Sequence, residues 1–248
     1  MIKQKILYDI KNLKDNENTI SDEKFLFFVI KSLEKGNFNF IICDNSEKML
    51  FLNKKNKFKK IKDNIIDDYV VKENRDMSFY LLGLTNKNNS LKNFIYKGND
   101  TKTKIFHNSK KDPSVLIFKS INKNSNWYLW HENFGMKNII ILNNDLPVIE
   151  NTFFGDYPNN LYISVINELN QSDSEYLLLI FYNNNYFYSG VYMGNGSEIF
   201  INTLFKPSLA IIKNLSSQSN WCLISDKFNK NEYFKLNSDY EIQKNENL

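Results

Sequence analysis

The feature that most constrains the fold of this 248-residue chain is an internal repeat. Residues 95–120 read IYKGNDTKTKIFHNSKKDPSVLIFKS, and residues 191–214 read VYMGNGSEIFINTLFKPSLAIIKN. Both stretches lead from a tyrosine through a Gly-Asn turn to Pro-Ser, an apolar run and a lysine. The tyrosines are 96 residues apart and the lysines are 94 apart. A fixed spacing of this kind indicates one supersecondary unit that is used more than once.

Further matches keep the same spacing. The segment SFYLL at 78–82 recurs 96 residues later as SEYLL, and Asn126-Trp127 recurs 94 residues later as Asn220-Trp221. One two-residue deletion in the intervening loop reconciles the two offsets. A weaker copy lies near the N-terminus, where Tyr8 and Lys31 have the same 23-residue separation as Tyr96 and Lys119.

These matches predict three modules. We expect a divergent first module over residues 1–95, a second over 96–191 and a partial third over 192–248. The third contains no counterpart of the Ser-x-Tyr-Leu-Leu segment, so it is expected to expose an apolar face and open strand edges. We therefore expect it to dock on the second module or on a neighbouring subunit.

The local pattern predicts β-strands. Short runs rich in Val, Ile, Leu, Phe and Tyr, such as FLFFVI, YLLLIFY and NIIIL, are bounded by Asn, Asp, Ser, Gly or Lys, as expected of turns. Residues 22–33 allow a short helix, but their apolar run fits a strand better. The predicted fold is all-β, with tandem antiparallel β-sandwich modules of jelly-roll type and an incomplete third repeat.

Composition excludes several classes of protein. The 42% apolar fraction indicates a globular chain. The net charge of +4 reflects abundant lysine, which we attribute to an A/T-rich genome, and a single arginine, Arg75, argues against a nucleic-acid partner. Apolar runs of about 6 to 8 residues are too short to insert in a membrane, and the N-terminus does not resemble a signal peptide. We expect a soluble protein made in a cytoplasm.

No group of residues predicts a metal site or a redox centre. The two histidines, His107 and His131, lack partner ligands at suitable spacing, and we interpret them as solvated or strand-edge residues. Cys43 and Cys222 each lie in an apolar run and are interpreted as small buried hydrophobes, with a disulfide between them as the alternative. No cofactor is predicted.

Catalytic motifs are also missing from the sequence. The acids at Asp67, Asp68, Asp173 and Glu175 lie in polar turns rather than in the paired arrangement that glycoside hydrolysis needs. The Gly-Asn-Gly at 194–196 lacks the spacing of a phosphate-binding loop and is interpreted as a tight turn. We predict a protein without enzymatic activity and without catalytic residues.

Two groups of residues are candidates for partner or receptor contact. A lysine-rich stretch at 54–62 is suited to phosphate, lipopolysaccharide or an acidic capsid surface, and otherwise is a solvated loop or a protected edge strand. The second group is aromatic and is interpreted as surface-exposed, whereas Trp127 and Trp221 are interpreted as core. The candidate contact residues are Lys54, Lys55, Lys57, Lys59, Lys60, Trp130, Tyr182, Tyr186 and Tyr188.

The order of these elements resembles a repeated β domain found in structural proteins of tailed bacteriophages, often in tail, fibre and appendage proteins of marine phages. The resemblance is clearest over 96–226, in YKGND, PSVLIFKS, NWYLWHE, SEYLLLIF, YMGNG, PSLAIIKN and NWCLISD. The family's Gly-rich segment before the Pro strand and its later Arg-Gly are not present here.

The resemblance implies a virion protein of the tail, tail fibre or appendage that acts in assembly and host attachment. Other virion proteins, a homo-oligomer (a trimer is favoured) and a host surface glycan are the expected partners. A capsid decoration protein and a glycan-binding or glycan-cleaving domain are the alternatives.

Overall fold

The protein is built from β-strands. The computed structural model describes residues 91–226, 228 and 232–238 together with Lys55, and it describes the backbone alone of the strands at 2–8, 25–32, 39–42, 48–51, 59–60, 79–85 and 243–244. Among these residues the helical elements are two short 3₁₀ helices, η2 (Glu132–Phe134) and η3 (Asn167–Leu169). The predicted all-β class is therefore confirmed. No helix in the described parts is both long and apolar enough to span a membrane.

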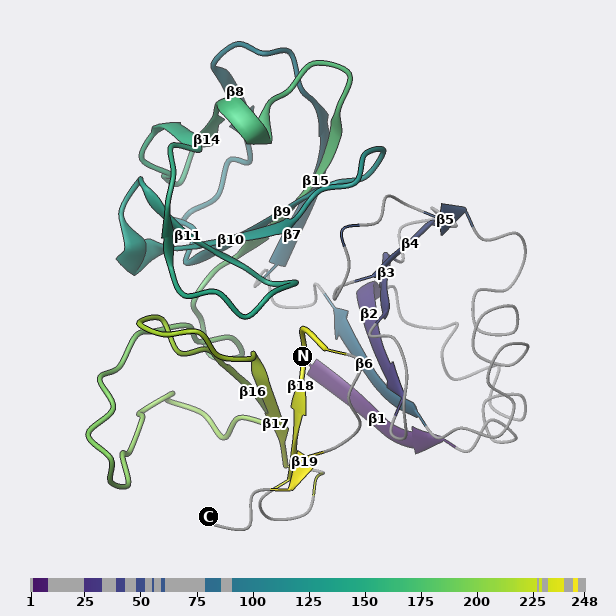
Figure 1. The fold of residues 1–248 in the computed structure, drawn as a ribbon, viewed down its shortest axis with the longest axis vertical. Helices are drawn as coiled ribbons and strands as arrows, with labels where there is room; N and C mark the ends of the chain where they lie inside the picture. Colours follow the sequence, from purple (N-terminus) through teal and green to yellow (C-terminus); the bar gives the residue numbers. More distant parts are fainter. Residues whose placement is uncertain are drawn as a thin grey trace.

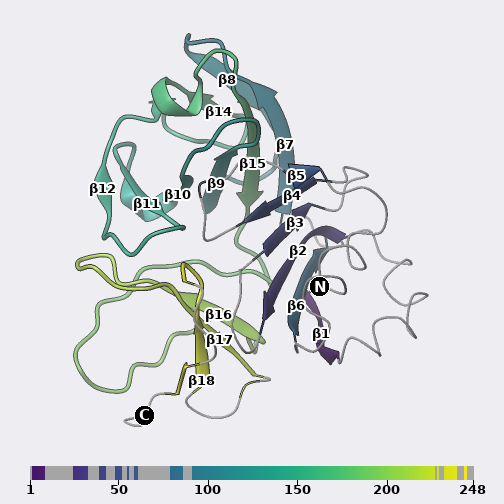
Figure 2. The same ribbon diagram turned by 45° about the vertical axis from the view of Figure 1, so that its right-hand side comes forward.

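The N-terminal strands form one six-stranded antiparallel sheet. Its order is β1-β6-β2-β3-β4-β5. These strands are β1 (Ile2–Tyr8), β2 (Phe25–Ser32), β3 (Asn39–Ile42), β4 (Lys48–Phe51), β5 (Lys59–Lys60) and β6 (Phe79–Thr85). The strand predicted within 22–33 is confirmed as β2. Figure 1 shows this sheet, in purple to blue, to the right of the teal and green strands that follow, and Figure 2 shows it turned by 45°.

A second six-stranded sheet is formed by strands within residues 91–181. Its order is β12-β11-β10-β9-β15-β7, and every pair is antiparallel. These strands are β7 (Leu91–Lys97), β9 (Val115–Ser120), β10 (Trp127–His131), β11 (Asn138–Ile141), β12 (Ile149–Glu150) and β15 (Glu175–Phe181). We call it the central sheet.

A small three-stranded sheet covers one face of the central sheet. It consists of β13 (Phe154–Asp156), β14 (Tyr162–Val165) and β8 (Thr103–Phe106), in that order. The core between the two sheets includes Ile105, Ile163, Val165, Leu116, Phe118, Leu178 and Ile180. Burial of each such side chain contributes about 1.5–3 kcal/mol, so the pair forms a β-sandwich with a substantial core.

A four-stranded sheet covers the opposite face. It runs β16 (Leu209–Ile212), β17 (Cys222–Ser225), β18 (Glu232–Lys235), β19 (Gln243–Lys244), and we call it the C-terminal sheet. Its core with the central sheet includes Trp127, Leu177, Leu179, Trp221, Leu223, Phe234 and Leu236. The central sheet is thus buried on both faces, which explains why β15 is apolar at successive positions instead of alternating.

The sheets share one strand order. In the N-terminal sheet β6 lies between β1 and β2, and in the central sheet β15 lies between β7 and β9. From β2 and β9 onward, each sheet continues through three strands in chain order. The C-terminal sheet has the same succession from β16 to β19. This shared order supports the predicted tandem modules, whose boundaries stay a prediction.

Candidate functional site

The same hydrogen bonds hold the β10–β11 hairpin of the central sheet and the β17–β18 hairpin of the C-terminal sheet. The Trp127 N–H donates to Asn143 Oδ1 at 2.7 Å, and Asn143 Nδ2 donates to Asn126 Oδ1 at 3.1 Å. Both bonds recur 94 residues later, from the Trp221 N–H to Asn237 Oδ1 at 2.9 Å and from Asn237 Nδ2 to Asn220 Oδ1 at 3.0 Å. The asparagine side chain thus satisfies a backbone donor at the start of β10 and of β17.

A buried lysine joins the central sheet to the N-terminal part of the chain. Lys119, at the end of β9, is fully buried, and its ammonium has three acceptors. Nζ donates to the carbonyl oxygens of Lys55 (3.1 Å) and Ser125 (3.0 Å) and to Ser125 Oγ (3.1 Å). The Ser125 N–H also donates to the Lys55 carbonyl oxygen at 2.9 Å. All three ammonium donors are therefore satisfied, which offsets much of the cost of burial.

Burial nevertheless changes the chemistry of this ammonium. Desolvation lowers the pKa of Lys119 from 10.5 to about 8. Its acceptors are neutral carbonyl and hydroxyl oxygens. With no carboxylate among those three partners, hydrogen bonding alone stabilises the charged form.

An equivalent lysine joins the C-terminal sheet to the central sheet. Lys213 Nζ donates to the carbonyl oxygens of Asp145 (3.0 Å) and Ser219 (2.6 Å), with Ser219 Oγ at 3.3 Å. The Ser219 N–H donates to the Asp145 carbonyl oxygen at 2.8 Å. Desolvation lowers the pKa of Lys213 as well, and the lysine is only half-buried.

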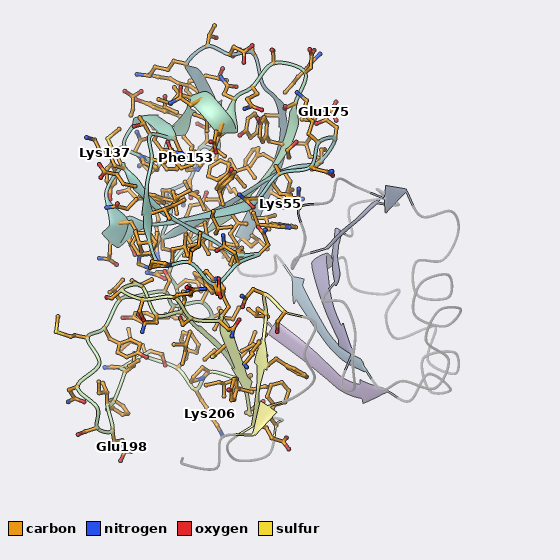
Figure 3. The ribbon with its side chains drawn as sticks, viewed as in Figure 1. Lys55, Lys137, Phe153, Glu175, Glu198 and Lys206 are labelled. Atoms are coloured by element: carbon orange, nitrogen blue, oxygen red, sulfur yellow. The ribbon has the colours of Figure 1, made fainter. Side chains whose placement is uncertain are left out.

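The two acceptor carbonyls occupy corresponding places. Lys55 lies between β4 and β5, and Asp145 lies between β11 and β12. Each carbonyl belongs to the sheet that precedes the lysine in the chain. We call these two sets of hydrogen bonds the lysine junctions. Figure 3 shows Lys55 on the side of the central sheet that faces the N-terminal strands.

Further contacts reinforce the second junction. The Trp221 Nε1–H donates to the Ile141 carbonyl oxygen at 3.3 Å, and the Val148 N–H donates to the Leu215 carbonyl oxygen at 3.1 Å. Together with the apolar core between the sheets, these bonds fix the C-terminal sheet against the central sheet.

The loop between β15 and β16 exposes an unusual amount of apolar surface. Met193 and Phe200 are each 90% exposed, and Leu204 is 83% exposed. Glu198 and Lys206 mark this loop in Figure 3, far from Glu175 at the start of β15. Large apolar side chains that are exposed in one loop are candidates for partner contact.

The Gly-Asn-Gly segment forms a bend in this loop. Gly196 has φ of 77°, a conformation that favours glycine, and the Ser197 N–H donates to Asn195 Oδ1. The tyrosine before it differs from its counterpart, because Tyr96 lies in β7 beside β15, whereas Tyr192 lies in an exposed irregular segment.

The lysines proposed for partner contact are described only in part. Lys55 is exposed, and its backbone carbonyl belongs to the first lysine junction. Lys59 and Lys60 form β5, whose side chains are not described. Lys54 and Lys57 lie outside the described residues.

The aromatic candidates divide into core and surface. Tyr186 and Tyr188 are exposed, as expected. The expectation that Trp130 and Tyr182 lie on the surface is wrong, because both are buried beneath the small sheet. Trp130 Nε1 donates to the Gly135 carbonyl oxygen at 2.6 Å. The core positions of Trp127 and Trp221 are confirmed.

Both histidines are buried, which corrects the interpretation of solvated or strand-edge residues. His107 Nε2 lies 2.8 Å from the Asn159 carbonyl oxygen, which requires a proton on Nε2. Nδ1 therefore accepts from the Tyr182 hydroxyl at 2.9 Å. His131 Nδ1 accepts from the Asn133 N–H, and its buried Nε2 has no hydrogen-bond partner among the residues that the structure describes. Burial lowers the pKa of both histidines.

Within the described residues, no three His, Cys, Asp or Glu side chains gather closely enough to hold a metal ion. Cys222 is a half-buried free thiol, and Cys43 lies outside the described residues.

Comparison with known proteins gives one match. The model of a family described as a domain of unknown function, DUF7483, matches residues 84–247, from the end of β6 to beyond β19. Neither the curated proteins nor the solved structures give a match.

Proposed function

Since this chain belongs to the DUF7483 family, whose function is unknown, we propose its function from the way its sheets are joined. It is a structural protein of a bacteriophage virion without enzymatic activity. It forms part of the tail or of a tail fibre or appendage, and it acts in assembly and host attachment. The resemblance of 96–226 to a repeated domain of phage tail proteins supports this assignment.

The lysine junctions are the observation that carries the proposal. At each one, an ammonium ties the end of a strand to the backbone of the preceding sheet, and the second junction is backed by a continuous apolar core. Directly packed sheets transmit force and hold orientation better than sheets joined by a flexible linker. That property suits a protein that carries an adhesive surface at a fixed position on a particle.

The partners follow from this role. We propose that the chain contacts other virion proteins and assembles as a homo-oligomer, with a trimer favoured. Tyr186 and Tyr188 offer exposed aromatic surface beside adaptable asparagine side chains, which suits contact with a receptor such as a host surface glycan.

Quantitative mass spectrometry of purified virions tests the proposal. The expected result is a copy number far below that of the major capsid protein and consistent with tail symmetry. A copy number comparable with the capsid protein would indicate a capsid decoration protein instead. Absence from virions would contradict both roles, and binding on a glycan array or release of reducing sugar would then favour a carbohydrate-specific domain.

A further inference from the structure

The outer edge of β16 has no strand beside it within the part of the chain that the structure describes. The C-terminal sheet begins at β16, whereas the equivalent strands β2 and β9 each have neighbours on both sides. Hydrogen bonding along β16 shows which groups point outward. The Asp226 N–H donates to the Ser208 carbonyl oxygen at 3.0 Å, so Ser208 bonds toward β17. Because antiparallel positions alternate, Leu209 and Ile211 direct their N–H and C=O groups to the outer edge.

The other two sheets show what kind of strand fits such an edge. β6 pairs with β2, and β15 pairs with β9, both antiparallel. The two inserted strands share the pattern Tyr-Leu-Leu, and β15 is buried at all but its first position. Leu179 of β15 lies opposite Ile117, whose counterpart 94 residues later is Ile211.

The neighbouring segment is also left without its usual partner. β7 pairs along its whole length with β15, but its counterpart at 187–193 forms no strand. Val191, Tyr192 and Met193 of this counterpart are exposed. In the central sheet β15 lies between β7 and β9. The counterpart of β9 is β16, whose outer edge is unpaired among the described residues, and the counterpart of β7 is the exposed segment 187–193.

We propose that the β16 edge binds an extended segment of another virion protein, running antiparallel to β16 and carrying apolar side chains as β15 does. Backbone hydrogen bonds to Leu209 and Ile211 provide affinity, and the apolar side chains of the added strand provide specificity. This inference names the kind of partner for the proposed structural role and rests on that role.

A different protein fits this edge better than a second copy of the chain does. In a second copy, the strands with the required pattern are β6 and β15, and both already lie between two neighbours. Releasing β15 would expose side chains that are buried in both cores, among them Leu177, Leu178, Leu179 and Ile180. The loss of that burial makes exchange of β15 between copies unfavourable.

Binding of a synthetic peptide tests the proposal on the full chain. The probe is the sequence of residues 172–184, SDSEYLLLIFYNN, with a solubilising lysine tag and a fluorophore, followed by fluorescence anisotropy. Two N-methylated peptides provide matched controls. Methylation at the residue equivalent to Leu179 removes the donor that faces β16, and is expected to weaken binding about tenfold or more. Methylation at the residue equivalent to Leu178 removes a donor that faces away, and is expected to preserve most of the affinity.

Substitutions in the protein test the same edge. Ile211→Pro removes an outward N–H while leaving the bonds of Ala210 and Ile212 to β17, and is expected to abolish peptide binding. Ile211→Thr keeps the N–H and is expected to bind. Circular dichroism checks that both variants fold, and the peptide controls stand even if Ile211→Pro does not fold.

Three results would overturn the proposal. These are failure of the unmodified peptide to bind saturably, equal binding of both methylated peptides, or a dimer in sedimentation analysis that Ile211→Pro converts to a monomer. The last would mean that a second copy occupies the edge. Detection of the chain in virions without peptide binding would leave the structural role intact while rejecting this docking site.

Discussion

The Lys213 ammonium donates a 3.0 Å hydrogen bond to the Asp145 backbone carbonyl oxygen, which joins β16 to the loop between β11 and β12. Lys119 makes the same bond to Lys55, at the preceding boundary between two sheets. In both cases a serine N–H shares the carbonyl acceptor. A residue that ends an apolar strand thus also fixes how two sheets meet.

Replacing Lys119 by methionine is expected to destabilise the protein. Lys119→Met removes three hydrogen bonds and leaves the half-buried oxygens of Ser125 with fewer partners. We expect the free energy of unfolding to fall by about 1–3 kcal/mol, measured by urea denaturation. The exposed Lys110→Met is the matched control and is expected to change stability by less than about 0.5 kcal/mol. Equal effects of the two substitutions would contradict a structural role for the junction.

The depressed pKa of Lys119 makes a second prediction, about alkaline pH. Above about pH 8 the folded protein releases this proton, while the unfolded chain holds it up to about 10.5. The unfolded state then binds more protons, so this lysine adds stability as pH rises through that window. The unfolding free energies of the native protein and of Lys119→Met are measured at several pH values from 7.5 to about 10.5. Both proteins have the same tyrosines, so the difference between the two unfolding free energies isolates the titration of Lys119. A constant difference in unfolding free energy across this range would show that Lys119 does not titrate abnormally.

The repeat made the core tryptophans predictable. Trp127 and Trp221 occupy the same place in two copies, each beside an apolar run, and both are buried. The strand order of the sheets also agrees with the repeat. The alignment of the repeated sequence segments does not by itself determine which strands pair in a sheet.

The burial of Trp130, Tyr182 and the histidines was not predicted, for a physical reason. A strand of a two-layer sandwich is expected to alternate between core and solvent, so a core position for Trp127 does not by itself predict burial of Trp130 in WYLWH. The central sheet is instead covered on both faces, and both parities are buried. The uninterrupted run YLLLIFY was the signal for this arrangement.

The buried histidines are expected to make the protein sensitive to acid. Burial holds the pKa of His131 and His107 below 6.5, so the unfolded chain gains protons first as pH falls below about 6.5. Stability contributed by the neutral histidines is therefore lost as pH falls through that range. His131→Phe removes one titrating group and is expected to flatten the pH dependence of the melting temperature between about pH 6.5 and 4.5. An unchanged profile in this variant would assign acid sensitivity to other groups.

The division between core and surface aromatics is testable by a matched pair of truncations. Trp130 is 1% exposed and packs edge-on against Phe154 with ring centroids 5.7 Å apart, so Trp130→Ala is expected to cost about 3–5 kcal/mol of unfolding free energy. Tyr186 is 48% exposed, and Tyr186→Ala is expected to change stability by less than about 0.5 kcal/mol. If Tyr186 contributes to receptor contact, its truncation is expected to reduce adsorption of virions to host cells while the melting temperature stays unchanged. Full adsorption with Tyr186→Ala would remove this tyrosine from the contact surface, and a stable Trp130→Ala would contradict its place in the sandwich core.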